Sequence, residues 1–469
     1  MLSPGIPELT ARIQTTIEEL RALLGERLSV SPSAIESHSR DESYHAAAPP
    51  DAVAFPASTK EVAGVVRICA ERGVPMIPFG AGTSVEGHVQ ALRGGVSIDL
   101  TKMNEILEVN PEDLDCLVQA GVNRVALNEQ LEKQGMFFPV DPGADATLGG
   151  MAATGASGTT TVRYGTMREN VLGMTVVTPD GVVVRTGGQA RKSSAGYDLS
   201  RLFVGSEGTL GVITELRLKL HPLPEAISAA VCPFDTIAGA VESVIEILQA
   251  GISVARVELL DESSLRAVNA YSKLSLPERP TLFFEFHGTE TGVEEQARLA
   301  GEIVAEHGAG DFEWAARREK REELWEARHE AYYAAKALRP GSSGWTTDVC
   351  VPVSRLAEII VATRREIDEA GLEAPILGHV GDGNFHVIFL LDPQYPEGAR
   401  KARAINASLL ERTLAAGGTC TGEHGVGMGK IEWLRAEHPD GVEVMRRIKA
   451  ALDPAGLMNP GKIFDSGTA

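Results

Sequence analysis

The sequence predicts an α+β fold in two domains, and three observations lead to this prediction. The chain has 469 residues, of which 43% are hydrophobic and 23% charged, an ordinary globular composition with enough length for two or three domains. Between residues 45 and 223, short strand-like runs and turn signals alternate with helical patterns. After the prolines of HPLPEA, near residue 223, longer helical patterns alternate with strands, so we place a domain boundary there.

Helix and strand signals are clear in the N-terminal half. Residues 1–44 are expected to form a helical lead-in, since apolar residues recur at helical spacing at Leu9, Ile13, Ile17, Leu20 and Leu24. Ser58 and Glu61 form a capping box that begins a second helix, and Gly73 ends it. Strands are predicted within DAVAFPAS, VPMIP, GGVSIDL, CLVQAGV, MTVVTPDGVVV, GVITELRLKL and, beyond the boundary, TLFFEFHG.

Charge and cysteine usage narrow the class of protein. The net charge of −20 argues against nucleic acid and anionic lipid surfaces as partners. The five cysteines are scattered and form no CxxC motif, so neither an iron–sulfur cluster nor a disulfide framework is indicated. The N-terminus has no basic stretch followed by an apolar run, and no segment could span a bilayer. We therefore expect a cytoplasmic protein without a transmembrane segment, and leave peripheral membrane attachment open.

A glycine-rich loop at residues 80–87 follows a predicted strand. Its spacing, GAGTSVEG, does not match the G-x-G-x-x-G dinucleotide fingerprint, and a strand rather than an amphipathic helix comes next. The loop still offers a nest of backbone N–H groups, with the hydroxyls of Thr83 and Ser84, that suits a pyrophosphate. Two further tracts of small residues, 141–170 and 205–214, allow close approach to a flat cofactor. The alternative is three unrelated tight loops.

Two histidines flank Gly-Asp-Gly-Asn in the stretch GHVGDGNFHVIFL, residues 378–390. A continuous strand would send His379 and His386 to opposite faces, and the glycines oppose a helix. A hairpin with residues 381–384 as its loop would place the two histidines opposite each other, with Cβ atoms about 5 Å apart. That spacing suits two ligands of one metal ion. The alternative is two unrelated histidines.

A glycine-rich stretch, TCTGEHGVGMGK at residues 419–430, contains two more candidate functional residues, Glu423 and His424. Its glycines force an irregular loop that can direct Glu423 and His424 at different targets. His379, His386 and Glu423 would form a two-histidine, one-carboxylate set that suits Zn²⁺ or Mn²⁺ and leaves positions open for substrate.

Several motifs together resemble a known family. PFGAGTSVEG, DPGADATLGGMAATGASGTTTVRYGT and GSEGTLGVITE are similar to the flavin-binding domain of vanillyl-alcohol-oxidase type flavoproteins. GHVGDGNFH, CTGEHGVGMGK and LDPAGLMNPGKIF resemble the FAD-dependent D-2-hydroxyacid dehydrogenases, with LWEARHEAYYAAKALRPG and TTDVCVPVSRL most like the cytochrome-linked D-lactate type.

The resemblance implies a domain arrangement and a flavin site. An FAD-binding domain is expected at residues 45–223, a substrate and metal domain with an antiparallel sheet at 224–430, and a C-terminal segment, 431–469, that returns to the FAD domain. Thr83 occupies the place of the histidine in relatives with covalent flavin, so non-covalent FAD is expected. The residues implied to contact FAD are Pro78, Gly80, Gly82, Thr83, Ser84, Gly87, Pro142, Gly143, Thr147, Gly150, Ala153, Gly158, Glu207, Gly208, Ile213 and Asn459.

The resemblance also implies roles in catalysis. A neutral imidazole near its natural pKa suits proton abstraction from a hydroxyl, and His424 matches the base of the family. Arg328, which shares a predicted helix face with Trp325 and Tyr332, matches the arginine that binds the substrate carboxylate. The hydride goes to the flavin.

Two positions bear on the substrate. Relatives that oxidise D-2-hydroxyglutarate carry a polar residue and a lysine where this chain has Ile388 and Thr346. A second carboxylate would be buried unpaired here, so D-lactate or another small or apolar D-2-hydroxy acid fits better. D-2-hydroxyglutarate and glycolate remain the alternatives.

The sequence leaves several electron acceptors and two other classes of protein as alternatives. A cytochrome, a quinone or an electron-transfer flavoprotein could accept the electrons, and a homodimer is the candidate assembly. The rivals from other classes are a non-haem iron oxygenase built on the same three ligands and a non-catalytic metal-binding subunit.

Overall fold

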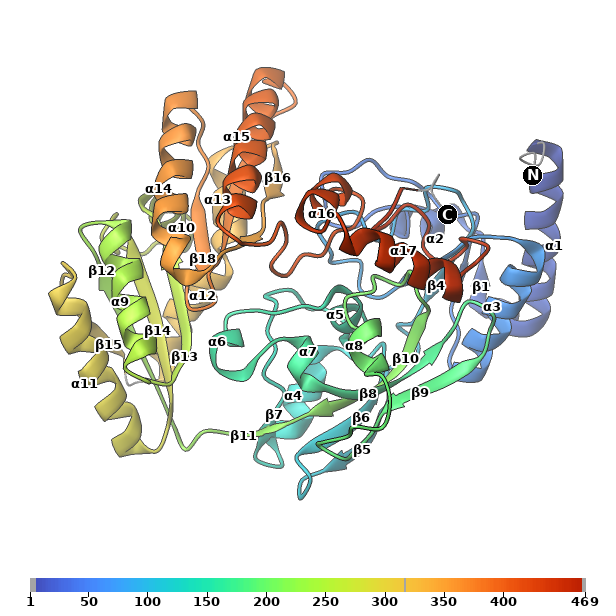
Figure 1. Cartoon of the computed structure of the whole chain (residues 1–469), viewed down its shortest axis with the longest axis horizontal. Helices are drawn as coiled ribbons and strands as arrows, with labels where there is room; N and C mark the ends of the chain where they lie inside the picture. Colours follow the sequence, from blue (N-terminus) through green and yellow to red (C-terminus); the bar gives the residue numbers. More distant parts are fainter. Residues whose placement is uncertain (1–5, 316–317, 466–469) are drawn as a thin grey trace. The chain divides into compact units, whose positions relative to one another are not determined.

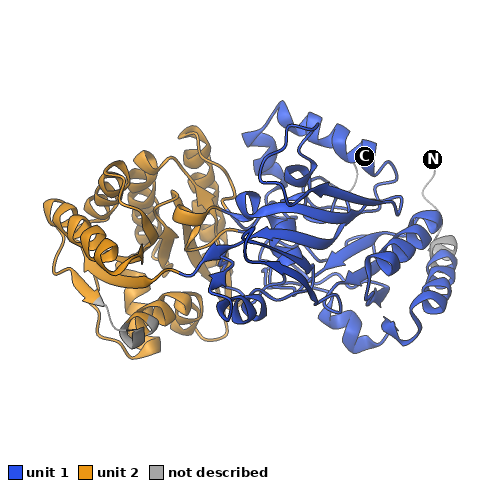
Figure 2. Ribbon diagram, turned by 90° about the horizontal axis from the view of Figure 1, so that it is seen from below, with its two compact units in different colours: residues 1–156, 166–223, 423–469 blue, residues 157–165, 224–422 orange. Residues whose placement is uncertain are grey.

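The computed structural model describes residues 6–315 and 318–465, which form two compact units. Figure 2 shows both units in different colours. Unit 1 comprises the described parts of residues 1–156, 166–223 and 423–469, and unit 2 comprises residues 157–165 and 224–422. Each unit is described by itself.

Unit 1 contains two main sheets. A four-stranded sheet has the order β1-β2-β4-β3, in which β4 runs parallel to β2 and β3. A five-stranded antiparallel sheet has the order β5-β6-β10-β8-β9, and β7 pairs with β11. The strands are β1 (Leu28–Ser29), β2 (Ala52–Ala54), β3 (Met76–Phe79), β4 (Val96–Asp99), β5 (Ile106–Asn110), β6 (Asp115–Gln119), β7 (Met136–Phe137), β8 (Val171–Val177), β9 (Val183–Gly187), β10 (Val212–Lys219) and β11 (His221–Pro222).

Helices cover the sheets of unit 1 (Figure 1). The helices are α1 (Ile6–Leu24), η1 (Gly25–Arg27), α2 (Pro32–Ser37), α3 (Thr59–Arg72), α4 (Arg124–Glu132), α5 (Leu148–Thr154), α7 (Met167–Asn170), α8 (Leu199–Phe203), α16 (Ile431–Glu437) and α17 (Gly441–Leu452). The predicted lead-in helix and the helix after Ser58 are confirmed. The hydroxyl of Ser58 accepts a hydrogen bond from Glu61 N, and Gly73 ends α3 in the left-handed conformation, with φ of 63°.

The C-terminal segment completes unit 1. Met76 N donates to Leu457 O and Asn459 N donates to Met76 O, both at 2.8 Å, so the last residues lie along β3. Lys449 Nζ donates to Thr209 O at 2.6 Å. Residues 423–430, which we predicted in the substrate domain, also belong to unit 1, because their backbone bonds to Glu207 and Glu86.

Unit 2 is built on one antiparallel sheet of eight strands. Its order is β15-β12-β14-β13-β18-β19-β16, and β17 also pairs with β19. The strands are β12 (Ala226–Pro233), β13 (Val254–Leu260), β14 (Thr281–Gly288), β15 (Glu313–Ala315), β16 (Ser343–Thr346), β17 (Val349–Cys350), β18 (Ile376–His379) and β19 (Asn384–Leu391). The helices are α6 (Thr161–Tyr164), α9 (Ile237–Gln249), α10 (Glu262–Ser272), α11 (Glu290–Glu306), α12 (Arg318–His329), α13 (Ala331–Leu338), α14 (Val353–Ala370) and α15 (Pro396–Ala415).

The β18–β19 hairpin corrects our predicted register. His379 pairs with Asn384, and His386 pairs with Leu377, so the loop is 380–383 and not 381–384. Gly383 adopts a left-handed φ of 80° against the backbone of Val351, where a side chain would not fit. The side chain of Asn384 then starts β19 by donating to Asp348 Oδ1 and Val349 O. Because the shift is two residues, the two histidines keep the same face of the hairpin as diagonal neighbours.

The predicted charged helix around Arg328 is also different in the structure. It divides at Glu330 into α12 and α13, so Tyr332 lies on the second helix. Within the described residues, no helix has both the length and the hydropathy required to cross a bilayer.

Candidate functional site

The three predicted cofactor loops meet in unit 1. The glycine loop leaves the end of β3, and a Cβ at Gly80 would clash with Thr147 Oγ1, the side chain that caps α5. A Cβ at Gly208, in the third loop, would lie 3.0 Å from Pro78 Cγ. Glu207 N donates to Ala153 O at 2.8 Å and so joins the second loop to the third. Small residues are therefore required where these backbones pack.

This part of unit 1 fits a bound cofactor. The hydroxyl of Ser206 is buried next to Glu207 and has no hydrogen-bond partner among the described residues. A buried polar atom of this kind is rare unless a ligand or water completes it. The nest of backbone N–H groups in the glycine loop suits an anion such as a pyrophosphate.

The remaining predicted FAD residues have varied surroundings. Ser84 Oγ donates to Asp41 Oδ2 at 3.0 Å, so this hydroxyl already has a protein partner. Gly143 has a φ of 76°, and the space where a Cβ would lie is open. Ile213 is buried in β10. Gly158 belongs to unit 2, where its N–H donates to Thr161 Oγ1.

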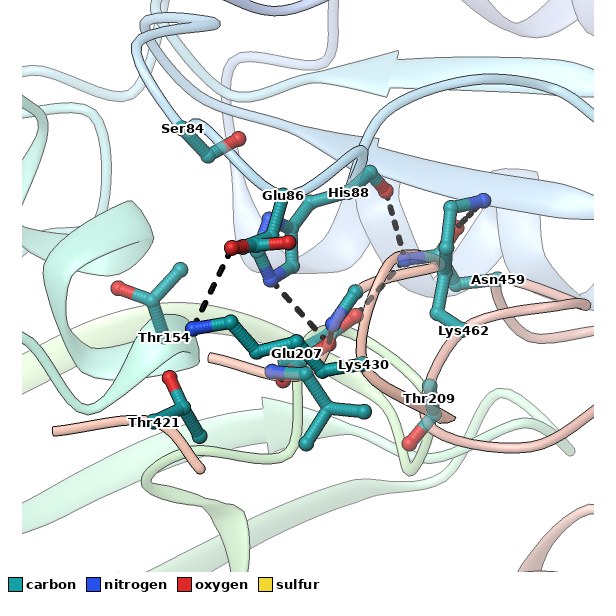
Figure 3. Close-up of polar contacts among 12 residues, drawn as sticks. Ser84, Glu86, His88, Thr154, Glu207, Thr209, Thr421, Lys430, Asn459 and Lys462 are labelled. Carbon is teal, nitrogen blue, oxygen red and sulfur yellow. Dashed lines mark hydrogen bonds and ion pairs between the residues drawn. The ribbon is translucent and has the colours of Figure 1, made fainter. Parts of the chain in front are cut away.

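Glu207 stands at the centre of a buried polar cluster in unit 1, which we call the Glu207 cluster: Glu86, His88, Glu207, Lys430 and Asn459 (Figure 3). The Glu207 carboxylate accepts hydrogen bonds from Val426 N at 2.7 Å and Gly427 N at 2.8 Å. His88 Nε2 lies 3.2 Å from Glu207 Oε2, and Lys430 Nζ lies 3.3 Å from Glu86 Oε1.

Asn459 closes the Glu207 cluster from the C-terminal segment. Its side-chain amide donates to Glu207 O at 2.7 Å and to His88 O at 3.0 Å. Glu207 and Asn459 both have positive φ values, 53° and 43°, a conformation that non-glycine residues rarely adopt. These bonds hold both backbones in that conformation.

Charges in the Glu207 cluster support one another. Burial would lower the pKa of His88, but the neighbouring Glu207 carboxylate outweighs burial and the pKa is raised. Burial would likewise raise the pKa of Glu207, but His88 and the two backbone N–H groups outweigh it and the pKa is lowered. Each member of the pair therefore favours the charged form of the other.

The two predicted metal-binding histidines lie together in unit 2. Their ring centroids are 5.6 Å apart, and both side chains are buried. His379 Nδ1 is hydrogen-bonded to Glu258 Oε1 at 2.7 Å, and His386 Nδ1 to Thr347 O at 2.9 Å. Both bonds favour the tautomer with the proton on Nδ1, which leaves the lone pair on Nε2. Metal-binding histidines are commonly oriented by bonds of this kind, so the pair fits a metal.

Arg328, the predicted substrate clamp, is buried in unit 2 rather than solvated. Its Nε and Nη2 groups donate to Glu258 Oε2 at 3.0 and 2.6 Å. Glu258 thus binds Arg328 with one oxygen and His379 with the other, and it is fully buried. Burial opposes the charged carboxylate, but His379 and Arg328 outweigh it, so the pKa of Glu258 is lowered.

Sequence reasoning missed Glu258, although a signal was present. VARVELL is an apolar strand with two charged residues, and a charge inside a buried strand requires a partner. It also missed Asp348, a buried carboxylate that accepts from Asn384 Nδ2 at 2.7 Å and from Thr421 Oγ1 at 2.8 Å. His386 Nδ1 lies 3.9 Å from Asp348 Oδ1.

Glu423 and His424, the predicted ligand and base, lie in unit 1 at the start of its last segment. The two side chains are mostly buried, and His424 Nε2 lies 4.0 Å from Glu423 Oε1. The complete metal set joins residues of both units and stays a prediction.

Comparison with known families matches both parts of the chain. The FAD binding domain model matches residues 50–187, and the model of the C-terminal domain of FAD linked oxidases matches residues 223–463.

Relatives match over nearly the full length. A probable mitochondrial D-lactate dehydrogenase of Danio rerio is 49% identical over 97% of this chain and 93% of its own. The mitochondrial D-lactate dehydrogenase [cytochrome] of Arabidopsis thaliana is 45% identical over 96% of this chain and 80% of its own. The glycolate oxidase subunit GlcD of Bacillus subtilis (strain 168) is 35% identical over 88% of this chain and 89% of its own.

Solved structures share the fold. p-Cresol methylhydroxylase superposes with a TM-score of 0.79 at 20% identity, covering 97% of both chains. The 4-ethylphenol oxidase from Gulosibacter chungangensis superposes with a TM-score of 0.77 at 20% identity, covering 97% of this chain and 98% of its own. The predicted α+β fold of the vanillyl-alcohol-oxidase type is confirmed.

One prediction is contradicted by these names. We expected a cytoplasmic protein, but four of the relatives are named as mitochondrial enzymes. The expectation rested on the lack of a leader pattern at the N-terminus, which is a weak basis because targeting segments vary and are removed from mature chains.

The family models, the relatives and the fold agree with one another. The chain therefore belongs to the FAD-linked oxidases, in the family of FAD-dependent D-2-hydroxyacid dehydrogenases, and is a flavin-dependent oxidoreductase.

Proposed function

We propose that the chain oxidises D-lactate, or a similarly small or apolar D-2-hydroxy acid, to the 2-oxo acid. The observation that carries this proposal is the histidine pair on β18 and β19 in a chain with an FAD-binding domain, with each Nδ1 already engaged. The names of the relatives at 49% and 45% identity support D-lactate as the substrate.

FAD would be held without a covalent bond by the three loops of unit 1. When bound, it supplies the acceptor for the C2 hydride. The backbone N–H groups of residues 80–84 would bind the pyrophosphate, and Ser206 Oγ would gain the partner that it lacks among the described residues. Thr83 stands at the position of a flavin-linking histidine, so no covalent link is expected.

A divalent cation, Zn²⁺ or Mn²⁺, would be held by His379, His386 and Glu423. When bound, it supplies a Lewis acid that orients the substrate and lowers the pKa of its hydroxyl. His379 and His386 would coordinate through Nε2, since Nδ1 of each ring donates to the protein.

His424 would take the hydroxyl proton on a ring nitrogen while the hydride leaves C2. It lies beside the proposed ligand Glu423 in a glycine-rich loop, so it can approach the substrate without occupying a metal position. Arg328 would bind the substrate carboxylate through N–H groups other than the two that it donates to Glu258.

Substrate size would be set by β16 and β19. Thr346 and Ile388, which differ from the hydroxyglutarate-oxidising relatives, are cross-strand partners, and Ile388 is buried. This pair offers no charge to a second carboxylate, which would be costly to bury unpaired. Glycolate is the second candidate, since a relative at 35% identity is named a glycolate oxidase subunit.

The electron acceptor is proposed to be a cytochrome, as in the names of three relatives. Electrons would leave directly from the flavin, because the sequence has no iron–sulfur motif. A quinone or an electron-transfer flavoprotein would be tested beside it as the acceptor.

Anaerobic bleaching of the flavin tests the function. The purified protein is mixed with D-lactate, L-lactate, glycolate or D-2-hydroxyglutarate, before and after treatment with a chelator. We expect D-lactate to bleach the flavin fastest, and we expect the chelator to abolish this. Bleaching by L-lactate alone, or indifference to metal removal, would contradict the mechanism. A colourless protein that holds iron would instead indicate the oxygenase alternative.

A further inference from the structure

The glycine-rich loop that carries His424 is bound in unit 1 through its backbone, and the side chain that accepts two of its amides is the buried carboxylate of Glu207. We propose that Glu207, which contacts His88, is a positioning residue that sets the conformation of residues 423–430 and thereby the direction of the His424 side chain. This inference rests on the proposed role of His424 as the base. It assigns to Glu207 a task other than contact with FAD.

The contacts of Glu207 are directed at the backbone of this loop. Its two carboxylate oxygens accept from two consecutive amides, Oε1 from Val426 N and Oε2 from Gly427 N. These amides are two and three residues after His424. A carboxylate that accepts two neighbouring N–H groups fixes the orientation of both peptide planes, so it limits the path of the chain at His424.

His88 contacts the same carboxylate of Glu207 (Figure 3). Its Nε2 lies 3.2 Å from Glu207 Oε2, and both side chains are buried. A buried carboxylate requires a counter-charge as well as hydrogen bonds, and His88 is the cation that contacts this one. Lys462 lies in the same region, but its Nζ donates to Gln90 O at 2.8 Å.

The glycines of the loop allow it to pack closely against Glu207, His88 and Glu86. A Cβ at Gly425 would lie 2.8 Å from Glu207 Oε1 and 2.9 Å from His88 Nε2. A Cβ at Gly427 would clash with Glu86 O, and Met428 N donates to Glu86 O at 3.0 Å. The loop therefore packs directly onto the Glu207–His88 pair and onto residue 86, with no side chain between them.

The first test combines hydrogen exchange with kinetics on the FAD-loaded full chain. In Glu207→Gln one acceptor oxygen becomes an amide NH₂, which cannot accept from a backbone N–H. We expect deuterium uptake of the peptide spanning residues 423–430 to rise at least tenfold in rate. We expect kcat for D-lactate to fall at least tenfold while KM changes less than threefold and FAD content stays at the wild-type level.

Asp99→Asn is the matched control. Asp99 is also a buried carboxylate of unit 1 paired with a histidine, His38 at 2.9 Å, and it also accepts from one backbone N–H, Thr101 N. Within the described residues, no hydrogen bond or ion pair joins the Asp99 side chain to residues 423–430. If both variants lose kcat and loop protection equally, the effect is general destabilisation and the inference fails.

A second pair of variants tests the packing without changing a charge. Gly425→Ala places a methyl group against Glu207 and His88, whereas Gly417→Ala has a similar φ, +78° against +83°, and open space around it. Both replacements carry the same backbone strain. We expect faster exchange at residues 423–430 and lower kcat in Gly425→Ala alone.

The two readouts separate this inference from the proposed function. If the wild type does not oxidise D-lactate, the proposed function fails, but the exchange rates still show whether Glu207 anchors the loop. Unchanged exchange in Glu207→Gln would overturn the anchoring. Faster exchange with unchanged kcat and an unchanged pH profile of kcat would overturn the positioning of His424. Glu207→Asp keeps a carboxylate and should retain part of the protection of residues 423–430, so a loss equal to that of Glu207→Gln would contradict the need for a carboxylate.

Discussion

The two units each contain a buried glutamate paired with a histidine, and the two glutamates bind different kinds of partner. Glu207 in unit 1 accepts hydrogen bonds from two backbone amides and contacts one cation, His88. Among the described residues, the carboxylate of Glu258 in unit 2 accepts only from side chains, namely those of Arg328 and His379. The first glutamate therefore determines the path of a chain segment, and the second determines the direction of two side chains.

This difference follows from the elements that carry the partners. The partner of Glu207 is an irregular loop rich in glycine, which has no ladder of its own and needs a side chain to satisfy its amides. The partners of Glu258 stand on a strand and a helix, whose backbones are already paired, so only side-chain directions remain to be set. We expect changes at Glu207 to alter the conformational mobility of residues 423–430, and changes at Glu258 to alter the affinity for the metal ion.

The largest effect is expected from the loop of unit 1. His424→Ala should lower kcat by a factor of about 10² to 10⁴, the usual contribution of a general base, while FAD remains bound. Stopped-flow flavin reduction measures the rate, and the absorbance at about 450 nm measures the bound FAD. Retained turnover would show that His424 is not the base and would remove the reason to position this loop.

The second largest effect is expected at Glu258 in unit 2. Glu258→Gln should lower the affinity for Zn²⁺ or Mn²⁺ by about 10- to 100-fold, because His379 loses the carboxylate that orients it. Calorimetric titration of the metal-free protein with each metal measures this without any turnover.

Glu285→Gln is the control for Glu258. Glu285 is likewise a buried glutamate of unit 2, bonded to His287 Nε2 at 2.8 Å and close to Arg256 Nε at 3.3 Å. Both variants leave buried cations without a carboxylate, which typically costs about 3–5 kcal/mol in the free energy of unfolding. Metal affinity should fall only in Glu258→Gln, and an equal fall in both would contradict an orienting role for Glu258.

A smaller effect is expected from the glycine loop. Gly80→Ala places a methyl group against Thr147 Oγ1 and should cost about 1–3 kcal/mol through overpacking, with lower FAD content after purification. Gly188→Ala has nothing within contact distance and serves as the control. Equal FAD content in the two variants would argue against a packed flavin site at this point.

The smallest effect is the pH dependence of the Glu207–His88 pair. The lowered pKa of Glu207 gives stability above its ordinary value of 4.5, and this stability is lost as the pH falls through the folded pKa. The raised pKa of His88 gives stability below its ordinary value of 6.5, and this stability is lost as the pH rises through the folded pKa. The contribution of the pair is therefore greatest between pH 4.5 and 6.5.

The comparison of wild type with His88→Asn isolates this contribution. The difference in unfolding free energy should decline above pH 6.5, with a slope of at most about 1.4 kcal/mol per pH unit for one proton. Urea denaturation at several pH values measures it. A difference that does not vary with pH would show that His88 is neutral in the folded state.

Much of the local structure was predictable from short stretches of sequence. Ser58 with Glu61 marks the start of α3, and Gly73 marks its end, because capping and left-handed termination depend on neighbouring residues. The small residues of the three loops indicated a cofactor site, and alternation of side chains placed His379 and His386 on one face of a hairpin. The family resemblance predicted the fold class and the chemistry.

Contacts between distant residues were decided only by the tertiary structure. The register of β18 and β19 depends on Asp348 and Val351, which lie some thirty residues earlier. His379 therefore pairs with Asn384, two residues before the partner that we predicted. The assignment of residues 423–430 to unit 1 depends on Glu207, more than two hundred residues away. Glu258 was overlooked because its partners, Arg328 and His379, come from other elements. The sequence by itself determined which turns, caps and faces could form, since those depend on local sterics and periodicity, whereas the pairing of buried charges depends on which elements the fold brings together.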